Sequence, residues 1–240
     1  MTIRAVCFDA TGTLIEPRES VGTVYARAAL AQGIKLPAWR LDDAFVRVLR
    51  GSPPLAGAGV SGASRAEREA AELAWWLERV RQVFQATDST VEFPDPKGFA
   101  RALFETWRGA DVWRVRAGAR ELLAVLAAAG LRLGLASRFD HRLPEILEGL
   151  DLLRFFEILE IPSRHGRAKP DRAVFEAIAE ALGVGLDELA YVGDDAPEVL
   201  AAIGALGLRV FDVRALPDLG VVATALGAVP RDAARRESGA

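Results

Sequence analysis

"IRAVCFDATGTL", residues 3–14, decides the fold of this 240-residue chain. Its run of Ile, Val and Phe is typical of a short buried strand, and Gly12 indicates a turn soon after it. The predicted strand therefore ends at Asp9. Because ligands bind beyond the carboxyl ends of the strands in an open parallel sheet, this carboxylate is a candidate functional group.

From about Trp113 onward, short apolar runs alternate with segments of helical periodicity. The four further predicted strands are "LRLGLAS" (131–137), "FEILEI" (156–161), "ELAYVGD" (188–194) and "LRVFDV" (208–213). Strands separated by helices imply a parallel sheet with right-handed crossovers. The predicted class is therefore α/β, with a Rossmann-like parallel sheet flanked by helices.

Between the first strand and Trp113, the sequence changes character. Apolar residues recur at helical spacing in four segments: 20–33, 37–50, 64–87 and 95–107. We expect an inserted α-helical cap over residues 16–112. The predicted core is 1–15 with 113–228, and the predicted flexible tail is 229–240. Residues 51–64, rich in Gly, Pro, Ser and Ala, are predicted to form a mobile loop that contacts the variable part of a substrate.

The composition argues against several classes of protein. Hydrophobic residues make up 51% of the chain and charged residues 26%, with a formal net charge of −3. Interspersed charges of this kind indicate neither a nucleic-acid-binding face nor a polybasic membrane anchor. The longest apolar stretch, residues 122–131, is too short to span a bilayer. The single cysteine, Cys7, is typical of a reducing compartment, so we expect a cytoplasmic protein. The sequence leaves the oligomeric state open, and our expectation is a monomer.

Polar groups follow four of the predicted strands, where they would meet at one edge of the sheet. These groups are Asp9, Ser137, Lys169 in the loop after the third strand, and the pair Asp194–Asp195. Any one of them alone could simply cap a helix or a turn. Together they predict a crevice that contains a carboxylate, a hydroxyl, an ammonium group and two further carboxylates.

Lys169 and the acidic pair carry the most chemical information. Only Lys35, Lys97 and Lys169 are lysines among 30 basic residues. A compact ammonium group suits a point contact with phosphate or carboxylate better than a guanidinium does. Asp194 and Asp195 repel each other, and a divalent cation would relieve that repulsion.

The combined pattern resembles the haloacid dehalogenase-like hydrolase superfamily, in the subfamily whose helical cap follows the first strand. Four segments are similar to its motifs: "FDATGTL" (8–14), "LGLAS" (133–137), "AKPD" (168–171) and "YVGDDAPE" (191–198). In addition, "WWLERVRQVF" (75–84) and "SRFDHRLPEILEGL" (137–150) resemble one branch. That branch contains the haloacid dehalogenase-like hydrolase domain-containing proteins and the rhythmically expressed gene product.

The resemblance implies a nucleophilic mechanism that starts at Asp9. This carboxylate would attack phosphorus and form an aspartyl-phosphate, with Mg²⁺ neutralising charge between the two anions. The implied metal-binding residues are Asp9, Thr11 through its carbonyl, Asp194 and Asp195. Ser137 would hydrogen-bond a phosphate oxygen, and Lys169 would balance the charge. Gly12 would allow the turn that presents backbone N–H groups to the phosphate.

Two smaller departures from the family pattern concern substrate and metal binding. Arg138 stands where Asn is common, so it is a candidate substrate-binding residue. Glu198 stands near the position of a further motif Asp. It could serve the outer shell of the metal, as could Asp195, or it could be a favourable acid in the first turn of a helix.

Thr11 is the largest departure, because phosphatases of the family carry a second Asp there as general acid and base. A threonine hydroxyl does not ionise near neutral pH. The implied substrate is a small phosphorylated metabolite, and a good leaving group such as an acyl or aryl phosphate would need no proton. The other open outcome is that the aspartyl-phosphate forms and persists. Two alternatives stay open: a catalytically silent binding protein, and a 2-haloacid dehalogenase, whose halide also leaves without a proton.

Trp75 and Trp76 are adjacent in a predicted helix, so their side chains point about 100° apart. We interpret one as a core residue and the other as packing between cap helices. The alternative is that one of them lines the cleft between cap and core.

Overall fold

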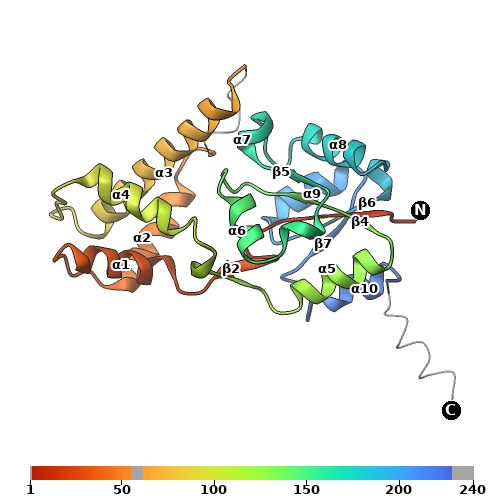
Figure 1. Ribbon diagram of the computed structural model, residues 1–240, viewed down its shortest axis with the longest axis horizontal. Coiled ribbons are helices and arrows are strands. Elements are labelled where there is room, and N and C mark those ends of the chain that lie inside the picture. Colours follow the sequence, from red (N-terminus) through yellow and green to blue (C-terminus); the bar gives the residue numbers. More distant parts are fainter. Residues whose placement is uncertain (1, 56–61, 229–240) are drawn as a thin grey trace, which may run out of the picture.

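A computed structural model describes residues 2–55 and 62–228. Its centre is a sheet of five parallel strands in the order β5-β4-β1-β6-β7. The strands are β1 (Ala5–Phe8), β4 (Arg132–Ala136), β5 (Ile158–Glu160), β6 (Leu189–Gly193) and β7 (Arg209–Asp212). Helices flank this sheet (Figure 1), so the predicted α/β class is confirmed.

β1 is the middle strand, and all four of its residues are fully buried. Its side chains alternate between the two faces of the sheet. Val6 and Phe8 belong to one hydrophobic cluster, and Ala5 and Cys7 belong to the other. Phe8 is in register with Leu135 of β4 and with Val192 of β6. These three strands therefore end at the same edge of the sheet.

The crossover helices explain why the sheet is covered on both faces. They are α5 (Ala119–Ala128), α6 (Leu143–Gly149), α7 (Pro162–His165), α8 (Arg172–Ala181), α9 (Pro197–Ala205) and α10 (Gly220–Ala225). Short 3-10 turns cover Ala110–Val112, Leu153–Phe155 and Leu186–Glu188. The segment around α7 was expected to be a loop. It forms one helical turn that begins at Pro162, a favourable residue for the first position of a helix.

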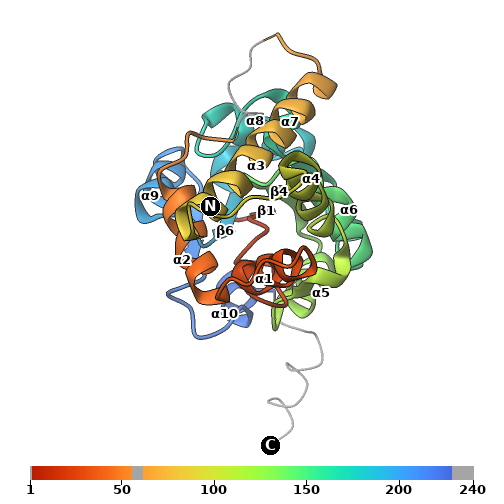
Figure 2. The same ribbon diagram turned by 90° about the vertical axis from the view of Figure 1, so that its left-hand side faces the viewer.

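Among the described residues between β1 and β3, four helices form a separate layer, which Figure 2 shows in front of the sheet. They are α1 (Val21–Ala31), α2 (Ala38–Arg50), α3 (Arg65–Thr87) and α4 (Pro96–Thr106). Ser64 begins α3 with a capping box to Glu67, and Asp95 caps α4. Stacked rings hold the layer together: the centroids of Tyr25 and Phe84 lie 5.6 Å apart.

An antiparallel ribbon, which the sequence analysis missed, joins the two ends of the helical segment. β2 (Ile15–Pro17) pairs with β3 (Trp113–Val115), so that Ile15 lies opposite Val115. Glu16 and Arg114 form an ion pair across the ribbon at 2.8 Å. Both chain connections between the helical layer and the sheet therefore run side by side.

Parts of two predictions lie outside the described residues: 56–61 of the predicted loop, and the whole predicted tail 229–240. No helix within residues 2–55 and 62–228 is long and apolar enough to cross a membrane.

Candidate active site

The turn after β1 places Asp9 at the carboxyl edge of the sheet. The Asp9 amide donates to the carbonyl of Val192 at 2.9 Å, which ties the residue to β6. Gly12 has a φ of +83°, and a Cβ there would overlap the carboxylate of Asp194. The Gly12 amide donates to Ile15 at 2.8 Å. Gly12 therefore allows the turn and the approach of Asp194, while its N–H is used within the turn.

Lys169 joins Asp9 to the end of β6. Its ammonium Nζ donates to Asp9 Oδ1 at 2.8 Å, to Asp195 Oδ2 at 2.9 Å and to Tyr191 Oη at 2.5 Å. The Lys169 side chain is 1% exposed, so these partners replace water completely. One buried cation thus holds two carboxylates in fixed positions.

Tyr191 was not singled out from the sequence. Its hydroxyl accepts from Lys169 and donates to Asp195 Oδ2 at 2.5 Å. Burial, together with the negative charges of Asp9 and Asp195, raises the pKa of Tyr191 and keeps the hydroxyl protonated. The only sequence signal was an aromatic residue in a buried strand that leads to the acidic pair.

Asp195 has both oxygens occupied. Oδ2 accepts from Lys169 and Tyr191, and Oδ1 accepts from Arg138 at 2.8 Å. Although burial opposes ionisation, Lys169, the Tyr191 hydroxyl and Arg138 hold the pKa of Asp195 below its ordinary value. Its geometry suits positioning of Lys169 better than metal binding, and Arg138 reaches the site as the partner of Asp195.

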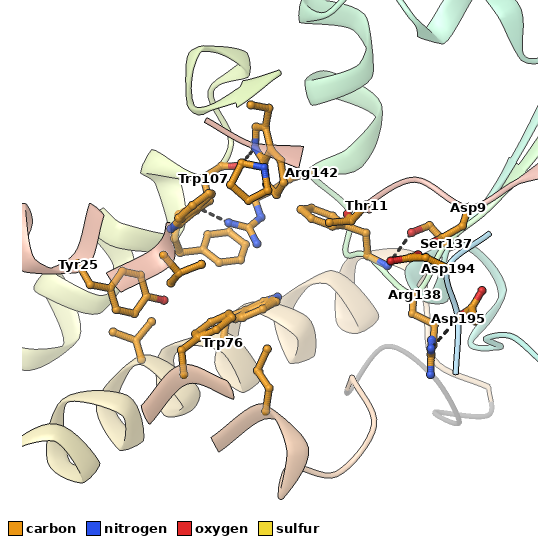
Figure 3. Close-up of a pocket in the computed structure, with 18 of the residues that line it drawn as sticks. Asp9, Thr11, Tyr25, Trp76, Trp107, Ser137, Arg138, Arg142, Asp194 and Asp195 are labelled. Carbon is orange, nitrogen blue, oxygen red and sulfur yellow. Dashed lines mark hydrogen bonds and ion pairs between the residues drawn. The ribbon is translucent and has the colours of Figure 1, made fainter. Parts of the chain in front are cut away.

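Asp194 lies beside Asp9 and is less engaged (Figure 3). Its Oδ1 accepts a hydrogen bond from Thr13 at 3.3 Å. The pKa of Asp194 is raised to about 6, chiefly by partial burial and secondly by the negative charge of the nearby Asp9 carboxylate. Two neighbouring carboxylates repel each other, and a divalent cation would stabilise the pair.

The donor set fits Mg²⁺, which prefers oxygen ligands and binds proteins through one or two carboxylates. Across 2–55 and 62–228, no three His, Cys, Asp or Glu side chains form a cluster suited to a metal ion. A site at Asp9 and Asp194 would therefore use two carboxylates, with the Thr11 carbonyl as the remaining protein ligand. Glu198 is exposed in the first turn of α9, as expected for an acid that favours a helix N-terminus.

Ser137 and Thr11 both line the same pocket as Asp9. Ser137 follows β4, and its Oγ accepts from the Phe139 amide at 3.2 Å, which leaves its hydroxyl hydrogen free to donate. Thr11 Oγ1 is buried and has no hydrogen-bond partner among the described residues. The predicted groups at the ends of β1, β4 and β6, with Lys169, are thus gathered at one edge of the sheet.

The pocket has a volume of about 440 Å³ and extends from Asp9 into the helical layer. Beyond the polar end its walls are mainly aromatic (Figure 3). Trp76 lines it, which corrects our interpretation of the two tryptophans as core and inter-helix residues. Trp75 instead directs its Nε1 toward the Pro53 carbonyl at 3.2 Å. The sequence could not say which of the two faces the cleft, because that depends on the rotation of α3.

Fold and site together define an α/β protein with a carboxylate and lysine site at the edge of its sheet, beneath a layer of helices. A model of the family described as "Hydrolase: haloacid dehalogenase-like hydrolase" matches residues 3–205. The chain belongs to this family.

Curated relatives agree with the predicted branch. The chain is 30% identical over 210 residues to haloacid dehalogenase-like hydrolase domain-containing protein 3 of Danio rerio, covering 86% of this chain and 83% of the relative. It is 23% identical to the rhythmically expressed gene 2 protein of Drosophila melanogaster, with 80% and 75% covered. It is also 30% identical to a phosphoglycolate phosphatase of Rhodospirillum rubrum, with 83% and 75% covered.

Among solved structures, the fold is similar to that of a putative beta-phosphoglucomutase from Thermotoga maritima. The TM-score is 0.64, the sequence identity is 22%, and the match covers 95% of this chain and 93% of the other. At this identity the likeness concerns the fold.

Proposed function

We propose that the protein is a Mg²⁺-dependent phosphatase or phosphotransferase that acts through an aspartyl-phosphate on Asp9. The observation that carries the proposal is the contact between Lys169 and Asp9 at 2.8 Å, beside Asp194 at the polar end of a pocket. The similarity to a phosphoglycolate phosphatase supports the same class of substrate. The proposed substrate is a small phosphorylated metabolite.

The contacts support different proposed tasks for the two oxygens of Asp9. Lys169 holds Oδ1, which leaves Oδ2 as the atom that attacks phosphorus. Ser137 would donate to a phosphoryl oxygen, and Lys169 would offset the negative charge that gathers around the attacking carboxylate. Asp195, with Tyr191 and Arg138, would keep Lys169 in place.

Mg²⁺, held by Asp9, Asp194 and the Thr11 carbonyl, would supply the charge neutralisation that two reacting anions require. Asp195, which the resemblance implied as a further ligand, is outside the proposed set, because its oxygens are engaged by Lys169, Tyr191 and Arg138. Among the described residues, no side chain in the hydrogen-bond network of the site takes the place of the acid that is missing at position 11. The proposed enzyme is therefore slow with alkyl phosphates and suited to good leaving groups.

The test is incubation of the purified protein with acetyl phosphate and Mg²⁺, followed by intact mass measurement. We expect one phosphoryl group on the wild type and none on Asp9→Asn. Absence of both the adduct and phosphate release from the folded wild type would support a silent binding protein instead. Release of halide from a 2-haloacid in the presence of a chelator would support a dehalogenase. The cytoplasmic location and the monomeric state stay predictions.

A further inference from the structure

The pocket has two chemically different ends. Asp9, Ser137 and Asp194 lie at one end, and rings from the helical layer and from the loop after β4 enclose the other (Figure 3). The aromatic wall includes Tyr25, Phe45, Trp76, Phe104, Trp107 and Phe139. These six flat rings provide a large apolar contact area, which suits a ligand with a large apolar part.

The cation at the aromatic end is already neutralised. Arg142 is buried and donates to Asp140 Oδ1 at 2.8 Å, to Asp140 Oδ2 at 2.6 Å and to the Phe104 carbonyl at 2.5 Å. Its guanidinium carbon lies 3.6 Å from the centroid of the Phe104 ring. Arg142 therefore stiffens the wall and is poorly placed to bind a second anionic group of a substrate.

Trp76 offers an unused hydrogen-bond donor in this wall. Its Nε1 is buried and has no acceptor among residues 2–55 and 62–228. Buried polar groups are nearly always paired, so an unpaired N–H on a residue that lines the pocket is a candidate donor to a ligand atom. The wall otherwise consists mainly of rings, which suits a flat ligand that carries few polar groups.

We propose that the preferred substrates are aryl phosphates, in which a flat apolar ring system lies against the aromatic wall. This inference rests on the proposed function and specifies its substrate class. A bond forms between Asp9 Oδ2 and phosphorus, the bond from phosphorus to the aryl oxygen breaks, and the aryloxide leaves with the electron pair. Solvent water protonates the aryloxide. Water then attacks phosphorus, which releases inorganic phosphate, regenerates Asp9 and returns a proton to solvent.

Leaving-group chemistry agrees with the shape of the pocket. An aryloxide spreads its charge into the ring and leaves far more readily than an alkoxide. Thr11, which supplies no acid, is therefore tolerable for an aryl ester and costly for an alkyl ester. The ring wall and the absent acid select the same class of substrate for independent reasons.

The first experiment compares kcat/KM for 2-naphthyl phosphate, phenyl phosphate and glycerol 3-phosphate, each with Mg²⁺. The two aryl esters have similar leaving groups, so their difference reports on the pocket. We expect 2-naphthyl phosphate to exceed phenyl phosphate by about tenfold or more, as extra apolar contact does in specificity pockets. Glycerol 3-phosphate should be the poorest. Equal values for the two aryl esters, or a preference for glycerol 3-phosphate, would overturn the proposal.

The second experiment tests whether Trp76 of the aromatic wall binds the ring of the substrate. Trp76→Ala should lower kcat/KM for 2-naphthyl phosphate at least about tenfold more than for acetyl phosphate, which is too small to reach the rings. Trp76→Phe keeps a ring and should lose less. Trp39→Ala removes a tryptophan that is 65% exposed on α2 and should leave both reactions unchanged. Equal losses with both donors in Trp76→Phe and Trp76→Ala would assign Trp76 a structural role and contradict the proposal.

The two levels of the argument fail differently. If acetyl phosphate neither labels Asp9 nor releases phosphate with the folded wild type, the proposed function is wrong and the substrate class falls with it. If acetyl phosphate labels Asp9 or is hydrolysed but 2-naphthyl phosphate is not preferred, only the substrate class is wrong.

Discussion

At the scale of the residue, Lys169 is the group on which the site depends. It is buried between Asp9 and Asp195, so its removal leaves two carboxylates without their common cation. We expect Lys169→Met to lower the free energy of unfolding by about 3–5 kcal/mol at neutral pH, as the loss of one partner of a buried ion pair does. Urea unfolding monitored by circular dichroism measures this.

Tyr191→Phe is the matched control for that experiment. It removes only the hydroxyl between Lys169 and Asp195, so the cost should be about 1–3 kcal/mol. If Lys169→Met costs no more than Tyr191→Phe, the charge pairing is not what holds these side chains together.

Thr11 decides which leaving groups the proposed enzyme tolerates. Thr11→Asp would place an ionisable carboxyl group where it could act as general acid and base for the reaction at Asp9. Turnover of glycerol 3-phosphate should rise, by up to about 10²–10⁴-fold. Thr11→Asn, which is similar in shape but supplies no proton, should give no such gain. A correctly folded Thr11→Asp enzyme with unchanged turnover would contradict the role assigned to position 11.

At the scale of the element, apolar runs in the sequence predicted the five parallel strands in their order along the chain. Asp9, Ser137 and the acidic pair could be predicted as neighbours because parallel strands end at one edge of the sheet. The ribbon β2–β3 could not, since each strand has three residues and a charged one at its centre. The sequence left open which of Trp75 and Trp76 lines the cleft, because that depends on the rotation of α3, and Tyr191 was missed because its role depends on side-chain length.

The contact between α3 and the loop after β4 makes stability depend on pH. Glu72 Oε2 accepts from the His141 amide at 3.0 Å and lies 2.9 Å from His141 Nδ1, and Glu72 Oε1 has no partner among the described residues. Burial raises the pKa of Glu72 despite these hydrogen bonds, and Asp140 raises it further. As pH rises, the folded state therefore releases the Glu72 proton later than the unfolded state does.

Because folding raises the pKa of Glu72, the contribution of this residue to stability is largest below its ordinary pKa of 4.5 and is lost as pH rises above that value. Glu72→Gln keeps the size of the side chain and removes the charge. Its free energy of unfolding, relative to wild type, should become more favourable as pH rises from 4.5 to 8. Urea unfolding across this range checks it. Glu69→Gln, on the same helix but paired with Arg65, is the matched control, and the rise for Glu72→Gln should exceed the change for this control. A flat difference for Glu72→Gln would show that folding does not raise the pKa of Glu72.

At the scale of the whole molecule, the helical layer meets the sheet at the ribbon and along α3. Near its start, α3 contacts α7: Arg68 Nε donates to the Ser163 carbonyl at 2.8 Å, and Nη2 donates to the Arg164 carbonyl at 2.7 Å. These bonds join segments almost a hundred residues apart in sequence. They hold the aromatic wall over Asp9, and their loss would favour an open arrangement that admits water.

Arg68→Met should therefore increase solvent access to the pocket. Three of the five tryptophans, Trp76, Trp107 and Trp113, line it, so acrylamide quenching of their fluorescence reports opening. We expect a larger quenching constant for Arg68→Met than for wild type, because hydrogen bonds from a charged donor contribute about 1.5–3 kcal/mol each. Arg65→Met is the control, since Arg65 lies in the same turn of α3 but pairs with Glu69 on its own helix. Equal quenching in the two variants would mean that the remaining contacts, such as the ribbon and the hydrogen bonds between Glu72 and His141, keep the helical layer over the site without Arg68.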